Sequence, residues 1–335
     1  MPDIALCMTV RNEEALIRAN LRYHHYIGVD RIYLYLDNPT DSTREQVRDL
    51  PYAVIGNSVN PETAQCDANL RDSVGESVIR QHSGHHCARQ ILNMADACIL
   101  ADREGFDWLV CIDADELVCP LDHMPEPDAL KRCLSALSDE TDAVSFLTLE
   151  LLQHRKSYNK VVFAEETLFK RMQDENGRPV ETAQCLRRAI PDPVCREKSL
   201  QPGYYYGHNE GKMAVRMRRG LVPQSVHRFR HPQRKVHIKA VPYLLHYVLY
   251  SLDDYLKKHR NFSQLPSRWV SGGPTPTHLQ SWIKFVNSHG STDEDIASYY
   301  RLHVQYPQGA IRQARHMNPS PIIEIDEVRR VFSRL

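Results

Sequence analysis

The sequence predicts an α/β protein with a mostly parallel, Rossmann-like sheet flanked by helices, and with a helical C-terminal extension. In the first third of the chain, short apolar runs alternate with amphipathic stretches, which is the pattern of strand-helix-strand units. Residues 108–112 are apolar throughout, as expected of a central parallel strand that is covered on both faces. The length of 335 residues allows one large α/β domain with an appendage, or two domains.

The first strand is expected over residues 4–10, and it runs into the polar residues 11–14 and a helix that ends near Gly28. One face of that helix has helical spacing, formed by Leu16, Asn20, Tyr23 and Ile27. Apolar or alternating runs predict further strands over 31–36, 52–59, 143–152 and, more weakly, 160–172.

A long helix is expected before residues 108–112. From Cys87 to Ala101, apolar residues recur at steps of four and three, which lays one apolar stripe on the sheet before Gly105 ends the helix. The remaining connections are expected to be a polar loop over 60–82, a short helix near 127–138, and loop with short strands over 173–210.

The C-terminal part begins with a strand-like run from Val241 to Tyr250. Ser251 can cap a helix through about Phe262, and the Gly-Gly-Pro sequence at 272–274 breaks the chain before further helices.

The composition excludes several classes of protein. Lys+Arg and Asp+Glu both number 42, which argues against a protein built wholly for nucleic acid. No window approaches the roughly 18 apolar residues of a spanning helix, and no basic segment precedes the apolar start of the chain. Nine cysteines without a C-x-x-C pair indicate free thiols rather than a disulfide framework or a zinc ribbon. We therefore expect a cytoplasmic protein, for which peripheral contact with a membrane stays open.

Polar side chains follow three of the expected strands, at residues 11–13, at Asp37 and at 113–116. In an open α/β sheet, ligands bind beyond the carboxyl ends of the strands. Because side chains alternate along extended chain, Asp113 and Asp115 are expected to point the same way and Glu116 the other. Two carboxylates on one side can share a hard divalent cation, Mg²⁺ or Mn²⁺ rather than Zn²⁺.

The segment from Gly211 to Leu252, called the basic tract below, contains no Asp or Glu. Its nine basic residues are Lys212, Arg216, Arg218, Arg219, Arg228, Arg230, Arg234, Lys235 and Lys239. This suits an anionic ligand such as a diphosphate or an acidic acceptor, with a solvated face or a nucleic-acid patch as alternatives. His227 lies inside the tract and is the histidine that we select as a third metal ligand. His85, His86 and Arg89 begin the long helix, where an ordinary polar helix face is the simpler interpretation.

Four ordered motifs carry a family resemblance: residues 9–14 (TVRNEE), 21–30 (LRYHHYIGVD), 33–38 (YLYLDN) and 108–116 (WLVCIDADE). In this order and spacing they resemble the glycosyltransferase family 2-like and family 92-like enzymes with the GT-A fold. Further on, Gly211-Lys212 followed by His227, and residues 245–247 with Ser251, are similar to the later motifs of that family.

The resemblance implies roles for residues of this sequence. Asp113 and Asp115 would hold a Mn²⁺ or Mg²⁺ ion on the diphosphate of a nucleotide-sugar, with His227 as a further metal ligand. Lys212 would contact a phosphate or the acceptor. The base and ribose would be held by Thr9, Val10, Arg11, Asn12, Glu13 and Asp37. Residues 1–240 would then form the nucleotide-sugar-binding catalytic domain, and 241–335 a partly helical acceptor-side or packing region.

The catalytic base stays open. An inverting transfer needs a carboxylate within hydrogen-bond reach of the acceptor hydroxyl, for which Glu150 and Glu210 are the candidates. A retaining transfer would need no base at that place. The Trp and Phe-Gly segment that many family 92-like members carry after the strand ending near Glu150 is not found, so the acceptor side cannot be carried over.

The sequence therefore predicts a metal-dependent glycosyltransferase of the hexosyltransferase type. It would move a sugar from a nucleotide-sugar, expected to be a UDP-sugar, to a hydroxyl of a glycan or of a lipid-linked saccharide, with no nucleic acid involved. A nucleotidyltransferase is the first alternative, although residues 11–14 lack the Gly-rich loop of that class. The second alternative is a non-catalytic module that binds polyanions or nucleic acid through residues 212–239.

Overall fold

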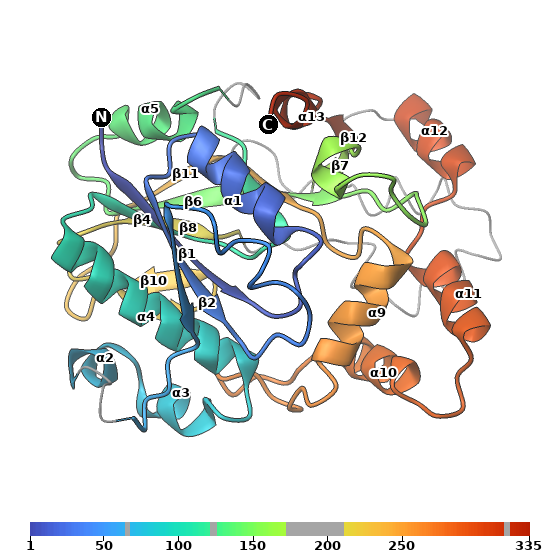
Figure 1. Cartoon of the computed structure of the whole chain (residues 1–335), viewed down its shortest axis with the longest axis horizontal. Helices are drawn as coiled ribbons and strands as arrows, with labels where there is room; N and C mark the ends of the chain where they lie inside the picture. The colour runs from blue at the N-terminus through green and yellow to red at the C-terminus, as the bar shows by residue number, and fades with distance from the viewer. Residues whose placement is uncertain (64–67, 121–125, 172–210, 318–321) are drawn as a thin grey trace.

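A sheet of ten strands forms the centre of the molecule (Figure 1). The computed structural model describes residues 1–63, 68–120, 126–171, 211–317 and 322–335. In these residues the strands of the sheet are β1 (Ile4–Val10), β2 (Arg31–Leu36), β3 (Ala53–Asn57), β4 (Trp108–Cys111), β5 (Glu116–Val118), β6 (Ala143–Leu151), β7 (Leu168–Arg171), β8 (Met213–Arg216), β11 (Ile238–His246) and β12 (Ile322–Glu324). A separate hairpin pairs β9 (Val222–Ser225) with β10 (Arg228–Arg230).

The sheet is mostly parallel, as predicted. The strand order is β12-β7-β6-β8-β4-β1-β2-β3, and β11 pairs with β6 and β5 off this path. The first four strands are mutually parallel, because β1 pairs parallel with β2 and β4, and β2 with β3. Strand β8 is antiparallel to both β4 and β6, so β6 regains the direction of β4. Of the ten strands only β5, β7 and β8 run against the others.

Both faces of β1 are covered, which explains why its sequence is apolar except at Thr9. Ile4, Leu6 and Met8 belong to an apolar cluster that includes residues of α1 (Ile17–Tyr26). Ala5 and Cys7 point to the other face and join residues of α4 (His86–Glu104). The predicted long helix is therefore confirmed, and Gly105 ends it with φ +85°, a conformation that favours glycine.

The structure differs from the sequence prediction in two segments. Residues 60–82 were expected to form a loop, but they contain α2 (Ala68–Ser73) and α3 (Glu76–Gln81). Each helix has 6 residues, too few to show periodicity, and Leu70 and Val78 pack on residues of α4. The basic tract forms β8, β9 and β10, none of which was predicted. The expected loop and short strands over 173–210 lie outside the described residues.

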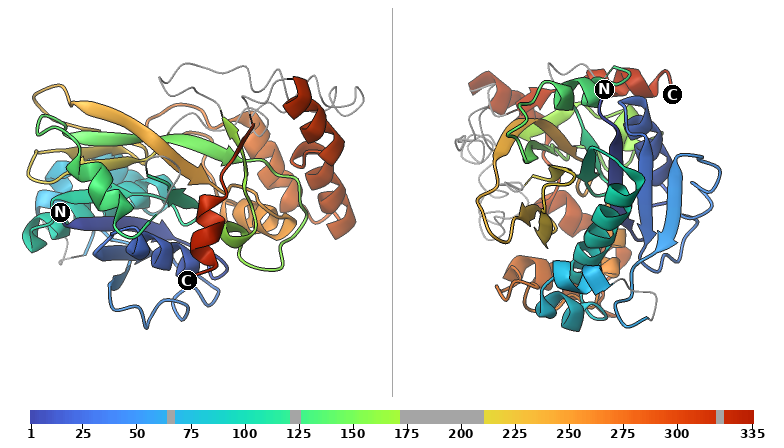
Figure 2. Two further views of the ribbon diagram at one scale, coloured as in Figure 1. Left: turned by 90° about the horizontal axis from the view of Figure 1, so that it is seen from above. Right: turned by 90° about the vertical axis from the view of Figure 1, so that its left-hand side faces the viewer.

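The C-terminal region is partly sheet and partly helix. Strand β11 pairs along its length with β6, and the expected boundary at 240/241 falls inside this strand. The helices that follow are α9 (Leu252–Asn261), α10 (Thr277–Val286), α11 (Asp293–His303), α12 (Gln308–Met317) and α13 (Glu327–Phe332). Helices α9 to α12 gather at the end of the molecule away from the N-terminus, as both Figure 1 and the left view of Figure 2 show. Ser251 caps α9 by accepting a hydrogen bond from the backbone N–H of Asp254 (3.1 Å), as predicted.

Two smaller expectations can be compared with the described residues. Six cysteines in this part of the chain (7, 87, 98, 111, 119 and 133) are free thiols. Among the helices described, none combines the length and the apolar character needed to cross a bilayer.

Gly211 permits a close approach of two strands. A Cβ atom at this position would lie 1.9 Å from the carbonyl oxygen of Phe146 in β6, and that oxygen belongs to the backbone and cannot swing away. The next residue, Lys212, accepts a hydrogen bond from the backbone N–H of Phe146 (3.0 Å). The backbone at 211–212 is therefore held firmly against β6.

We predict that Gly211→Ala destabilises the protein by about 1–3 kcal/mol, because the added methyl group overpacks this contact. The measurement is thermal unfolding followed by circular dichroism. Gly56→Ala in β3 is the matched control, since a Cβ there meets no atom within 4 Å. Equal melting temperatures for the two variants would contradict the prediction.

Candidate active site

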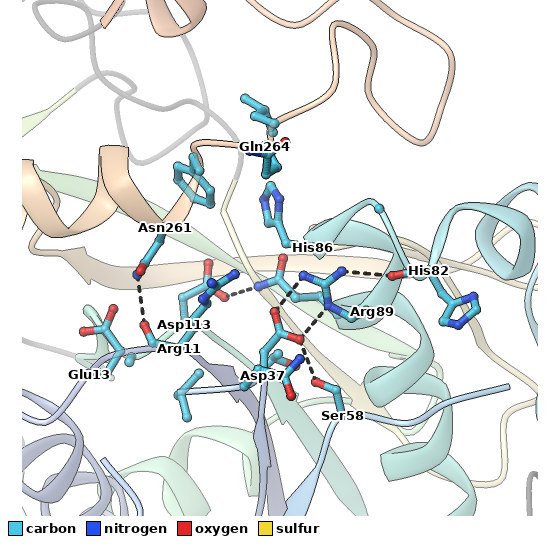
Figure 3. Close-up of a pocket in the computed structure, with 18 of the residues that line it drawn as sticks. Arg11, Glu13, Asp37, Ser58, His82, His86, Arg89, Asp113, Asn261 and Gln264 are labelled. Carbon is cyan, nitrogen blue, oxygen red and sulfur yellow. Dashed lines mark hydrogen bonds and ion pairs between the residues drawn. The ribbon is translucent and has the colours of Figure 1, made fainter. Parts of the chain in front are cut away.

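Four strand ends and two helices border one cavity of about 850 Å³ at the carboxyl edge of the sheet (Figure 3). Its walls come from the ends of β1, β2, β3 and β4 with the loops after them, from the first turns of α4 with residues 82–84 before it, and from the last turn of α9 with the segment that follows. The predicted residues on these walls are Thr9, Val10, Arg11, Glu13, Asp37, Asp113 and Asp115. The ends of β1, β2 and β4 are the three that the sequence predicted to meet at one edge, and the end of β3 joins them.

The loop after β1 is fixed from several sides. Asn93 of α4 donates to the hydroxyl of Thr9 (2.9 Å), and the backbone N–H of Asp37 donates to the carbonyl of Val10 (2.8 Å). Asn12 has φ +57° and hydrogen-bonds through its side chain to Asn261 of α9 (2.9 Å) and to the backbone N–H of Thr40 (2.7 Å). Asn12 therefore holds the loop, whereas its neighbours Arg11 and Glu13 line the cavity.

Glu13 lines the cavity, and the pKa of its carboxyl group is raised. Burial raises the pKa of its carboxyl to about 7, while the nearby ammonium group of Lys257 acts in the opposite direction. Lys257 Nζ lies 2.7 Å from Glu13 Oε2. The contact joins the loop after β1 to α9.

Asp37 is buried and paired. The guanidinium of Arg89 donates to both of its carboxylate oxygens (2.5 and 2.9 Å), and the hydroxyl of Ser58 lies 3.3 Å from Oδ1 (Figure 3). Arg89, on the first turns of α4, thus belongs to the cavity rather than to an ordinary polar helix face. A bidentate pair of this kind fixes the carboxylate plane firmly.

Asp113 and Asp115 lie on the wall of the same cavity, and each contacts a lysine. Asp113 accepts from Gln90 Nε2 (3.0 Å) through Oδ1 and from Lys212 Nζ (2.8 Å) through Oδ2. Asp115 Oδ2 accepts from Lys258 Nζ and lies 3.4 Å from His246 Nε2. Burial alone would raise the pKa of both carboxyls, but the neighbouring cations, Lys212 for Asp113 and Lys258 for Asp115, hold each pKa below its ordinary value.

The two aspartates share a side for a different reason from the one expected. The chain turns after β4, with the backbone N–H of Glu116 donating to the carbonyl of Asp113 (3.1 Å), so it is not extended there. Glu116 lies behind the turn, buried, and accepts from the backbone N–H of Asp113 (2.8 Å). Burial raises the pKa of Glu116 to about 7. The predicted orientation is right, but a turn produces it.

Helix α1 holds this turn through side-chain hydrogen bonds to the backbone. Asn20, fully buried, donates to the carbonyls of Ala114 (2.9 Å) and Glu116 (2.8 Å). His24, also fully buried, accepts from the backbone N–H of Val118 through Nε2 (3.2 Å). Two residues of the first helix therefore position the acidic turn without touching the cavity themselves.

The basic tract contributes Lys212 and His227 at this end. His227 Nδ1 lies 3.3 Å from the carbonyl of Gly211, and His227 contributes to the lowered pKa of Asp113. Other members of the tract are engaged elsewhere: Arg216 stacks over the ring of Trp108 at 4.7 Å, and Arg234 pairs with Asp142 at 2.6 Å. The tract is therefore not one continuous anion-binding surface at the cavity.

The three predicted metal ligands do not form a closed group in this structure. Within the described ranges, the group whose ligand atoms all lie within 4.8 Å of one another consists of His85, His86 and Cys87. Asp113, Asp115 and His227 are not such a group. The two aspartates share the cavity wall, whereas His227 is not part of that wall and lies next to the carbonyl of Gly211.

Of the two candidate bases, Glu150 lies among the residues that the structure describes and Glu210 does not. Glu150 is buried (3% exposed) and lies 3.3 Å from Lys170 Nζ and 3.6 Å from His246 Nδ1. His246 therefore stands between Glu150 and Asp115, and these carboxylates raise its pKa to about 10 although burial opposes this. Glu210 lies outside the described residues.

This arrangement is that of an open α/β protein whose ligand site lies at the carboxyl ends of its parallel strands. The family model for glycosyltransferase family 92 matches residues 3–274, most of the chain. The chain belongs to glycosyltransferase family 92. The family match confirms the resemblance found in the sequence, and the structure confirms the predicted mostly parallel α/β sheet.

Individual relatives are distant. The chain is similar to two glycosyltransferase-like proteins of Arabidopsis thaliana, at 23% identity over 318 residues (89% of this chain, 57% of the relative) and 24% over 326 residues (90% and 67%). It thus spans little more than half of the first relative. Among solved structures it is similar to glucosyl-3-phosphoglycerate synthase from Mycobacterium tuberculosis in complex with Mn²⁺, UDP and phosphoglyceric acid. That match has 12% identity and a TM-score of 0.29, and it covers 64% of this chain and 56% of the other.

We predict that His24 makes stability depend on pH. Burial lowers its pKa from 6.5 to about 4, so between these values the unfolded chain takes up a proton that the folded protein does not. Stability should therefore fall as the pH drops from about 6.5 to about 4, by on the order of 3 kcal/mol from this group. Urea unfolding across this range should show a shallower dependence for His24→Gln. His25→Gln, on the same helix, is the control, and equal slopes for all three proteins would refute the prediction.

Proposed function

We propose that this chain transfers a sugar from a nucleotide-sugar, a UDP-sugar in the first instance, to a hydroxyl of a glycan or of a lipid-linked saccharide, with a divalent metal ion. Since the chain belongs to glycosyltransferase family 92, one observation of its structure supports this proposal most directly. The polar loops after β1 and β2 and the two aspartates after β4 line a single cavity of about 850 Å³. That volume is within the usual range for a small-molecule site.

The loops after β1 and β2 are proposed to hold the base and the ribose. Thr9, Val10, Arg11 and Glu13 line the cavity beside Asp37, and Asn12 holds their loop in place. Arg89 occupies both oxygens of Asp37, so a ribose hydroxyl would share that carboxylate with the guanidinium. Such a preformed pair costs little ordering when a ligand arrives.

Asp113 and Asp115 fit a hard divalent cation by their chemistry. Both offer carboxylate oxygens to the cavity, and the Asp113 side chain is 35% exposed. Each carboxylate already pairs with the ammonium group of a lysine, so both positions accommodate a positive charge. We propose Mn²⁺ or Mg²⁺ here, with His227, which acts electrostatically on Asp113, as a further ligand. Such an ion would supply a Lewis acid for the diphosphate oxygens.

Lysines of the chain can stabilise the departing diphosphate. As the sugar leaves, negative charge grows on the β-phosphate oxygens, and fixed cations next to them lower the barrier most at that moment. Lys212 and Lys258 are the cations nearest to the two aspartates. Lys212 is therefore proposed as a phosphate contact.

No catalytic base is assigned for the acceptor hydroxyl. Glu150 is tied to Lys170 and His246, and Glu150 as a base would have to leave both. This favours a mechanism in which the hydroxyl proton is accepted by another group. A transfer with retention, which needs no base on that side, agrees equally with the described residues.

We predict that UDP with Mn²⁺ raises the melting temperature of the wild type and that this shift is lost in Asp113→Asn and in Asp115→Asn. A ligand at 100 times its Kd stabilises the native state by about 3 kcal/mol, which thermal shift detects. GDP, CDP and ADP, each with Mn²⁺, Mg²⁺ or EDTA, complete the panel and name the donor.

Sugar transfer should fall by about 10²–10³-fold in the same two variants, because an interaction with the developing charge is lost. Asp139→Asn is the control, since the Asp139 side chain is 99% exposed and remote from the cavity. Full transfer activity in both folded variants would overturn the proposed metal site, and the absence of a shift with every nucleotide would overturn the proposed donor.

A further inference from the structure

Lys258 reaches the cavity from the C-terminal region, a part of the chain for which the sequence suggested acceptor contacts or packing. It lies in the last turn of α9, lines the cavity, and contacts Asp115 across 143 positions of sequence. Asp115 is 7% exposed at its side chain and Lys258 19%. A carboxylate this buried needs a cation beside it, and in this structure Lys258 is the nearest one.

The two lysines at the aspartates differ in how firmly they are held. Lys212 is 3% exposed, its backbone is pinned by the Gly211 contact with β6, and its ammonium group also faces the carbonyl of Val226 (3.4 Å). Lys258 extends from a helix at the edge of the cavity, and its side chain lines the cavity and is 19% exposed. Lys212 is a fixed cation, whereas Lys258 can move without moving the backbone.

Other contacts keep α9 in place when Lys258 moves. Lys257 pairs with Glu13 of the loop after β1 (2.7 Å). Asn261 accepts a hydrogen bond from Asn12 Nδ2 (2.9 Å) and donates one to the carbonyl of Arg11 (3.2 Å). Because these contacts hold both ends of the last turn, the movement needed is a rotation of one side chain.

We propose that Lys258 is an exchangeable counter-ion: it neutralises Asp115 while the donor site is empty and moves to the diphosphate of the donor when a divalent cation takes its place on Asp115. This inference rests on the proposed function. An ammonium group and a divalent cation on one carboxylate oxygen would repel each other strongly in a buried site, so they exclude one another there. The diphosphate supplies the new anionic partner that Lys258 then needs.

The exchange has a thermodynamic consequence. A cation that arrives without a nucleotide must displace Lys258 and leave it unpaired, so it binds weakly. A cation that arrives with the diphosphate gives Lys258 a new partner. Metal and nucleotide should therefore bind with positive coupling, and each should raise the affinity for the other by the same factor.

The test is calorimetric titration of the full chain with Mn²⁺ alone, with UDP alone, and with UDP at saturating Mn²⁺. In Lys258→Gln, Mn²⁺ alone should bind about tenfold more tightly than in the wild type, because its competitor is gone. UDP at saturating Mn²⁺ should bind about tenfold more weakly, because a cation on the diphosphate is gone. The two changes have opposite signs, which a merely structural lysine would not produce.

Two further variants complete the design. Lys258→Arg keeps the charge and should retain weak binding of Mn²⁺ alone, so it distinguishes charge competition from altered packing. Lys284→Gln removes an exposed lysine from α10 in the same C-terminal region and should behave as the wild type. Circular dichroism melting confirms that each variant is folded before titration.

The outcomes separate this inference from the proposed function. If Mn²⁺ binds the wild type, fails to bind Asp115→Asn, and binds Lys258→Gln with unchanged or lower affinity, the exchange is refuted and the metal site stands. If Mn²⁺ binds none of the folded proteins, with or without UDP, the proposed metal site fails and the exchange fails with it. If UDP binds equally with and without Mn²⁺ in the wild type, the coupling is absent and the exchange is refuted.

Discussion

The burial of carboxylates at the carboxyl edge of the sheet is the constraint on which the rest of this structure depends. Parallel strands deliver Asp37, Asp113 and Asp115 to one edge, and each carboxylate is partly or wholly removed from water. A buried charge without a partner is costly, so each one requires a cation. The partners are Arg89 from α4, Lys212 directly before β8, and Lys258 from α9. Three separate segments are thereby fixed relative to the ends of β2 and β4, next to the cavity.

The elements that the sequence predicted well are those whose surroundings are uniform. Strands β1 and β4 are covered on both faces, so every position except Thr9 is apolar and the pattern is unambiguous. Helix α4 lies with one stripe on the sheet and ends in a glycine, so its period and its end can both be recognised. Asp113 and Asp115 were identified because a wholly apolar strand delivers them to an edge, where packing gives no reason for acids.

The residues that the sequence did not identify depend on partners far along the chain. Arg89 pairs with Asp37 across 52 positions, and Lys258 with Asp115 across 143. On an amphipathic helix, a basic residue is typical of a solvated face, and only the tertiary contact distinguishes the two cases. Asn20 and His24 show the reverse: they lie in or beside a recognisable motif, yet they act by holding the backbone of the acidic turn. A motif can therefore contain residues that hold the backbone of a loop rather than line the cavity.

The charges around the cavity bear on how the proposed donor and metal ion would bind. Asp113 and Asp115 face Lys212 and Lys258, with His246 beside Asp115, so both acids already have cationic partners. A divalent ion alone would therefore add positive charge to carboxylates that are already paired. On the proposed exchange, the ion takes the carboxylate of Asp115 and the released ammonium group of Lys258 takes a phosphate, so the two ligands together would keep the charges balanced. Helix α9, which carries Lys258, would then be part of the donor site.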